Sequence, residues 1–174
     1  MDLMAILSRC LLATTFGIAA FSKLRSRAAR AAFLESVEAL EVLPAPMVRR
    51  LSQVTVFSEA AVVLLLIGPA ETATIGFLLS STLLLIFTGA LLIVIRRGHR
   101  RSCRCFGTSA TPVGPLQVAR NLVLLAMSLA GLMAIASEPT PSLDSAPLTM
   151  TIAAGAILGV LIASIDEIIE VFRV

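Results

Sequence analysis

Two cysteines one residue apart, Cys103 and Cys105, are the side chains of this sequence best suited to chemistry. A thiolate can attack a disulfide, and a second thiol nearby can resolve the mixed disulfide that forms. The pair lies in a loop, residues 96–115, that also contains His99 and five arginines. One of these arginines, Arg104, stands between the two cysteines, and cationic neighbours favour the thiolate form. One hypothesis is therefore a pair of thiols that can cycle between dithiol and disulfide.

The same residues fit two other hypotheses. His99, Cys103 and Cys105 are ligands that suit a soft metal ion, although a structural zinc site needs four ligands. The cysteines also fit a loop in which both thiols simply stay reduced. A lone C-x-C spacing does not separate these three interpretations, so it leaves open whether the protein is an enzyme.

The composition indicates what kind of fold must position this loop. Of the 174 residues, 57% are hydrophobic and 14% are charged, and the mean hydropathy is +0.97. Soluble domains carry about 25% charged residues, so we predict a membrane protein with a single domain over residues 1–174. The net charge of +3 does not indicate nucleic-acid binding, because the basic residues stand beside apolar spans. In that position they set orientation and contact phospholipids.

Five apolar stretches recur along the chain. Each is long enough, or nearly long enough, to cross a hydrocarbon core of about 30 Å. They cover residues 3–22, 47–67, 73–95, 116–136 and 147–165. Because backbone groups in lipid must be hydrogen-bonded within the protein, we predict an all-α fold, a multi-pass transmembrane helical bundle. Residues 25–43 place apolar side chains at helical spacing among charged ones, which predicts an amphipathic helix in the membrane interface. A solvated connector is the other interpretation of this segment.

Positive charge predicts the orientation of the bundle. Most lysines and arginines lie in or beside the connections that follow the first and third spans, whereas the other two connections hold only acidic charges. Cytoplasmic loops carry the excess of basic residues. We therefore expect the N-terminus outside, and the C-terminus and the C-x-C loop in the cytoplasm.

Ionisable residues inside or beside the spans are the other candidates for function. Glu59 lies within the second span, where such a group normally faces the bundle interior or a cavity. We expect it to be protonated or paired, and we expect Glu59→Gln to preserve the fold. Lys23 and Arg120 lie near a membrane edge, where they can extend toward water. Asp166 closes the last span and is expected to lie in water, and Cys10 is expected to be a buried packing residue.

Small residues at four-residue spacing predict which helix faces pack closely in lipid. Gly155 and Gly159 form a G-x-x-x-G motif that Ala163 continues, and Ala13 and Gly17 have the same spacing in the first span.

Four short motifs or residues have a characteristic order along the chain. They are Phe21-Ser22-Lys23-Leu24, Glu59, Cys103-Arg104-Cys105-Phe106-Gly107 and Arg120-Asn121. This order resembles the methylamine utilisation protein MauE family, within the wider DoxX-like group of small bacterial membrane proteins. The resemblance covers about residues 1–170, and C-x-C-F-G is its most specific element. The family often has a small residue, commonly glycine, where this chain has Arg104.

The resemblance implies a multi-pass protein of the bacterial inner membrane that supports thiol–disulfide chemistry in maturation of an extracytoplasmic protein. For the family, that client is the disulfide-rich small subunit of methylamine dehydrogenase, and a thioredoxin-like protein is a partner. Cys103 and Cys105 would be the redox pair and Glu59 an intramembrane carboxyl of the site. Arg104 and Arg120 would be partners of the thiolate or of the bundle.

Three points stay open in the sequence. No resident cofactor is indicated, but an exported client lies across the membrane from the predicted cytoplasmic loop, so a quinone is a candidate electron carrier. The rival hypothesis is a small transporter or soft-metal-handling protein, in which Glu59 lines a path and His99, Cys103 and Cys105 collect the ion. The sequence does not indicate the oligomeric state.

Overall fold

The computed structural model describes residues 3–39, 44–97, 114–137, 145–166 and 168. This part of the chain forms the helices α1 (Leu3–Leu24), α2 (Arg27–Ala39), α3 (Ala45–Ile67), α4 (Ala70–Arg96), α5 (Pro115–Ala136) and α6 (Ser145–Ala163). Within the described residues there is no strand, and five helices are long and apolar enough to cross a membrane. The prediction of an all-α, multi-pass transmembrane helical bundle is confirmed.

Prolines and a glycine set several of the helix boundaries. Proline fits the first turn of a helix, where its missing N–H would have no partner within the helix. Pro115 begins α5, and Pro46 lies in the first turn of α3. Gly68 and Pro69 separate α3 from α4, and the Gly68 N–H donates to the Leu64 carbonyl at 2.9 Å. The second and third apolar stretches therefore form a helical hairpin with a short connection.

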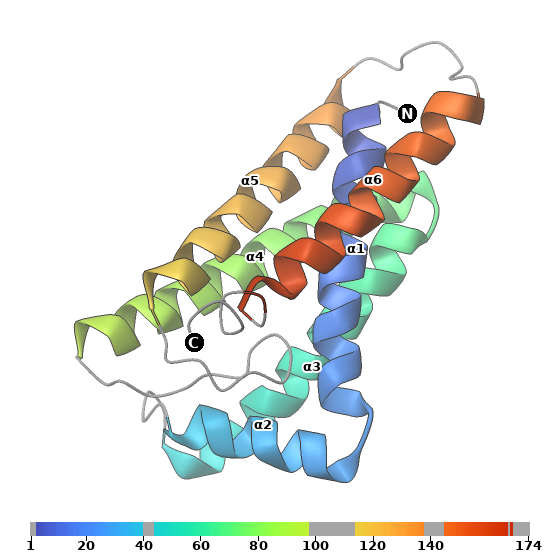
Figure 1. Ribbon diagram of the computed structural model, residues 1–174. Helices are drawn as coiled ribbons and strands as arrows, with labels where there is room; N and C mark the ends of the chain where they lie inside the picture. The colour runs from blue at the N-terminus through green and yellow to red at the C-terminus, as the bar shows by residue number, and fades with distance from the viewer. Residues whose placement is uncertain (1–2, 40–43, 98–113, 138–144, 167, 169–174) are drawn as a thin grey trace.

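α1 is the central helix of the bundle. It contacts α2, α3, α5 and α6, while α4 packs against α3 and α5. Figure 1 shows α6 crossing α1, α4 and α5 running beside each other, and α2 lying across the lower end of α1 and α3. The helix predicted within residues 25–43 is therefore present as α2, with Phe33 buried on its inner face and Arg27 and Arg30 exposed. Its position in the membrane interface stays a prediction.

Contacts between side chains give the relative directions of the helices. Ser80 and Ser81 of α4 hydrogen-bond to Ser128 of α5, at 2.7 and 2.9 Å, and the Phe77 ring packs on Gly131. The order of these contacts makes α4 and α5 antiparallel. Their hydroxyl groups join the two helices where lipid provides no hydrophobic force between them.

α6 runs parallel to α1 and approaches it closely through two glycines. A methyl group on Gly155 would lie 2.8 Å from the Leu7 carbonyl oxygen, and one on Gly159 would lie 2.7 Å from that of Leu11. Only glycine allows backbones so close, so the G-x-x-x-G motif does mark a packed face. Cys10 lies at the same contact and is half-buried, with its Cβ beside Gly155.

The bundle consequently has one basic end, at which α1, α4 and α6 end and α3 and α5 begin. Its charged residues include Arg25, Arg27, Arg30, Arg49, Arg50, Arg96 and Arg97. The opposite end, where α3 is followed by α4, carries Glu71. The connection after α1 and the residues that flank 98–113 therefore share one end, in agreement with their charge. The side of the membrane that this end faces stays a prediction.

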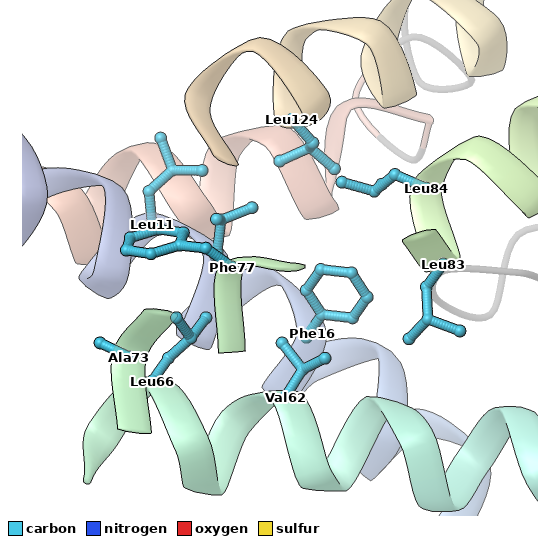
Figure 2. Close-up of a cluster of buried hydrophobic side chains, with 10 residues drawn as sticks. Leu11, Phe16, Val62, Leu66, Ala73, Phe77, Leu83, Leu84 and Leu124 are labelled. Carbon is cyan, nitrogen blue, oxygen red and sulfur yellow. The ribbon is translucent and has the colours of Figure 1, made fainter. Parts of the chain in front are cut away.

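The core of the bundle is apolar and draws on four helices (Figure 2). Phe16 of α1, Val62 and Leu66 of α3, Phe77 of α4 and Leu124 of α5 are each at most 1% exposed. The core holds α1, α3, α4 and α5 together, and three of these helices, α1, α3 and α5, contribute buried polar groups described next.

Candidate functional site

The predicted redox pair and its neighbours lie outside the described residues. These are His99, Cys103, Arg104 and Cys105. The structure does describe the residues on both sides: α4 ends at Arg96 and α5 begins at Pro115, both at the basic end. Elsewhere in the described part of the chain, no group of three or more His, Cys, Asp or Glu residues is arranged to hold a metal ion. The redox and metal hypotheses therefore both concern the loop itself.

Glu59 forms a buried ion pair with Lys23, in which the Lys23 Nζ donates to the Glu59 Oε1. The two side chains are 3% and 0% exposed. The expectation that Lys23 extends toward water is wrong, because α3 places a carboxylate beside the last turn of α1. The Phe33 ring of α2 covers the ammonium, with its centroid 4.8 Å from Nζ, in a cation–π contact. The expectation that Glu59 is protonated or paired is met by this pair.

The second carboxylate oxygen of Glu59 is less well satisfied. Oε2 is buried and has no hydrogen-bond partner among the described residues. Burying a charged group is costly unless its hydrogen bonds are complete. An open acceptor inside a membrane bundle is a place where a proton, a water molecule or a polar group of a ligand can bind. Lys23 occupies the other oxygen, so only one of the two carboxylate oxygens of Glu59 is paired.

A second buried ion pair joins α5 to the end of α6. Arg120 Nη1 donates to Asp166 Oδ2 at 2.5 Å, and Gln117 Nε2 donates to Oδ1 at 3.1 Å. Asp166 is 4% exposed and Arg120 is 6% exposed. The expectations that Asp166 lies in water and that Arg120 extends toward it are wrong, since the two meet between the helices and neutralise each other.

Gln117 extends this network to the edge of the C-x-C segment. Its Oε1 accepts a hydrogen bond from the backbone N–H of Gly114 at 2.9 Å. Gly114 is the first described residue after the segment that contains the cysteines. A hydrogen-bonded chain therefore runs from Gly114 through Gln117 to Asp166. It fixes the point where the loop enters α5.

Sequence reasoning assigned no role to Arg9, which the structure places at the other end of the bundle. Its Nε donates to the Leu66 carbonyl at 2.7 Å and its Nη2 to the Gly68 carbonyl at 2.5 Å. The last carbonyls of a helix lack partners within it and form the negative end of its dipole. Arg9 thus caps α3. An arginine in one apolar span and a Gly-Pro helix stop in another were the features that could have predicted this contact.

The junction of α2 and α3 contains a cavity of about 280 Å³ at the basic end. Its walls are mostly apolar and include Phe33 and Val56, but Arg30, Arg49 and Ser52 also line it. Phe33 therefore has one face toward the cavity region and covers Lys23 as well. This cavity could not be predicted from the sequence, because its two walls come from separate helices.

Taken together, the apolar helices, the buried ion pairs and the basic end define a multi-pass helical membrane protein. The family model described as methylamine utilisation protein MauE matches residues 1–134. The chain belongs to this family, as its motifs suggested, and membership supports a role as a membrane protein in methylamine utilisation. Neither the curated proteins nor the solved structures gave a significant match. The family match includes Lys23, Glu59, both loop cysteines and Arg120, and it ends before α6.

Proposed function

We propose that this protein supports thiol–disulfide exchange in the maturation of an extracytoplasmic protein, with Cys103 and Cys105 as the redox pair. The observation that supports this most directly is the family match, which extends over both cysteines. The arginine-rich surroundings in the sequence favour the thiolate that such exchange requires. A client of the kind implied by the family, rich in disulfides, needs such an activity.

In the direct form of the proposed exchange, which requires the pair and the client on one side of the membrane, a client thiolate attacks one sulfur of the Cys103–Cys105 disulfide, whose S–S bond breaks as a mixed disulfide forms. A second client thiolate then attacks the client sulfur of the mixed disulfide. The client gains a disulfide, and the C-x-C pair becomes a dithiol that holds two electrons and two protons. These pass to an oxidant, for which we propose a quinone of the membrane, or to a thioredoxin-like partner in its disulfide form.

The buried polar network of α5 acts as a positioning device in this proposal. Gln117 bonds both Gly114 and Asp166, while Arg120 pairs with Asp166. A loop that must present two sulfurs to a partner benefits from a fixed anchor, because attack on a disulfide depends on access and geometry. In this proposal Arg120 acts as a partner within the bundle, through its pair with Asp166, and Arg104 remains the candidate thiolate partner.

The experiment that tests this proposal is a redox titration of the full-length protein. A Cys10→Ser background leaves Cys103 and Cys105 as the only thiols of the chain, since it contains three cysteines. The purified protein is equilibrated in a series of thiol buffers, trapped with an alkylating reagent and measured by mass. We expect a single two-electron transition from dithiol to disulfide.

Matched variants make the result specific. Cys103→Ser and Cys105→Ser should each abolish client oxidation, because attack and resolution need both sulfurs, whereas Cys10→Ser should retain it. Thiols that stay reduced in oxidising buffer, together with a stoichiometric metal ion in the purified protein, would contradict the proposal and favour the soft-metal hypothesis.

The side of the membrane requires its own measurement. A membrane-impermeant thiol reagent added to intact cells should leave Cys103 and Cys105 unlabelled, and added to inverted vesicles it should label them, if the basic end is cytoplasmic. Labelling in intact cells would reverse the proposed orientation and allow direct contact with an exported client.

A further inference from the structure

The cavity between α2 and α3 has the composition of a site for an anionic amphiphile. Arg30 of α2 and Arg49 of α3 line it from two different helices, and both residues are exposed. In the described part of the chain neither guanidinium takes part in an ion pair. The acidic residues of α2 that the structure describes, Glu35 and Glu38, do not line the cavity.

A buried hydroxyl without a partner marks the same cavity. Ser52 lines it and is 7% exposed, and its Oγ forms no hydrogen bond within the described residues. Serine and threonine hydroxyls in a helix usually bond to a carbonyl of the preceding turn, as Thr88 does here. A buried hydroxyl that does not do so is available to a ligand. It stands on the wall that also carries Arg49, one helical turn away.

The remaining walls suit a hydrocarbon chain. Leu24 and Phe57 line the cavity and are 48% and 75% exposed on the outer surface of the helices. Apolar wall therefore continues from the cavity onto the surface that faces lipid. A free inorganic anion would use the arginines and Ser52 but would gain nothing from these side chains.

We propose that this cavity binds the phosphate-bearing end of an anionic phospholipid. Arg30 and Arg49 hold the phosphate, Ser52 donates a hydrogen bond to it, and the first part of an acyl chain lies along Leu24 and Phe57. The volume of about 280 Å³ fits a headgroup and the start of a chain, while the rest of the lipid stays in the bilayer. Basic pockets beside membrane helices bind lipid headgroups in this way.

The bound lipid would also lie close to the buried ion pair. Phe33 forms part of the cavity wall and its ring covers the Lys23 ammonium. A lipid in the cavity fixes the position of α2 against α3, and with it the ring that shields Lys23 from the interface. The inference is independent of the proposed redox function, since it involves neither of the loop cysteines.

The test measures lipid binding to the full-length protein by native mass spectrometry after reconstitution. Bilayers of phosphatidylglycerol and of phosphatidylcholine provide the anionic and zwitterionic arms. We expect phosphatidylglycerol to be retained and Arg30→Gln with Arg49→Gln to weaken its retention at least about 30-fold, because each substitution removes a direct charge-assisted hydrogen bond to the phosphate, which contributes about a factor of ten or more. Arg27→Gln with Arg50→Gln is the matched control: it removes the same charge from the same two helices outside the cavity and should change retention less than about threefold.

Two further measurements, a Ser52 variant and competition by inorganic phosphate, test whether the ligand is a phospholipid or a soluble anion. Ser52→Ala removes a hydroxyl that has no partner to lose, so the fold should survive while retention of phosphatidylglycerol falls. Thermal unfolding of each variant in detergent verifies the fold. Equal losses in the cavity variant and the control variant would overturn the proposal, as would equal retention of the two lipids. Displacement of the lipid by millimolar inorganic phosphate would assign the cavity to a soluble anion instead.

Discussion

The two buried ion pairs of this bundle differ in how completely their carboxylates are satisfied. Asp166 accepts hydrogen bonds at both oxygens, from Gln117 and from Arg120. Glu59 accepts from Lys23 at one oxygen, while the other has no partner in the described part of the chain. The first pair is a closed arrangement that joins α5 to α6. The second is an open one that joins α1 to α3.

This difference indicates different roles for the two pairs. A closed pair stabilises a contact, whereas a buried pair with an open acceptor is expensive, and we interpret that cost as a sign of a role beyond stability. The family match reaches both members of the Lys23–Glu59 pair but ends before Asp166. The open pair therefore belongs to the part of the chain that the family model describes, and the closed pair fastens the remaining helix to that part.

Lys23→Met should have the largest effect, because it leaves Glu59 buried without a cation. We expect a loss of about 3–5 kcal/mol in the free energy of unfolding, measured by titration with SDS in mixed micelles. Adding Glu59→Leu to Lys23→Met should restore most of this loss, since no charge is then buried alone. A loss below about 1 kcal/mol in the single variant, the range of exposed pairs, would show that the pair is hydrated and that the contrast with Asp166 is wrong.

Asp166→Asn should have a smaller effect. The asparagine keeps a carbonyl oxygen for Gln117, and Arg120 lies near the end of the bundle, where its long side chain can reach water. We expect a loss of about 1.5–3 kcal/mol by the same titration, the range for a hydrogen bond to a charged group. Glu71→Gln, an exposed acid at the opposite end, is the control and should change stability by less than about 0.5 kcal/mol. A larger loss for Asp166→Asn than for Lys23→Met would reverse the assignment of open and closed pairs.

Phe33→Leu should have the smallest effect of the three. It keeps an apolar side chain over Lys23 but removes the ring, which contributes about 0.5–1 kcal/mol as a cation–π contact. In a Lys23→Met background the same substitution should cost less, because there is no ammonium to cover. A double-mutant cycle measures this coupling. Equal costs in both backgrounds would mean that Phe33 only packs and does not take part in the open pair.

The sequence predicted the helices well because each apolar run is a local property. The helix α4, for example, can be predicted from its own apolar stretch without reference to the helices that pack beside it. The burial of Glu59 also followed, since a carboxyl within an apolar span has few alternatives. Its partner did not follow, because the choice of Lys23 depends on how α1 is rotated against α3.

The same limit explains the errors at the ends of the helices. Asp166 and Arg120 both lie close to span ends, where solvent is the simplest partner, and their pairing depends on the packing of α5 beside the end of α6. Arg9 finds the end of α3 by tertiary packing as well. The clue to these pairings was charge balance, because each buried acid needs a buried base: Glu59 has Lys23 and Asp166 has Arg120. The pairing also changes one expectation: Glu59→Gln now leaves an ammonium buried opposite an amide, so it should destabilise the bundle.

The glycine contact between α1 and α6 has a consequence for biogenesis. Thr15 of α1 donates to the Gly159 carbonyl of α6, across a separation of 144 residues in the chain. At a synthesis rate of about 5–20 residues per second, roughly 7–30 seconds pass between the emergence of the two surfaces from the ribosome. During this interval the face of α1 that later receives the two glycines is covered by lipid or by the insertion machinery. The bundle is therefore completed late, after the open ion pair between α1 and α3 has had time to form.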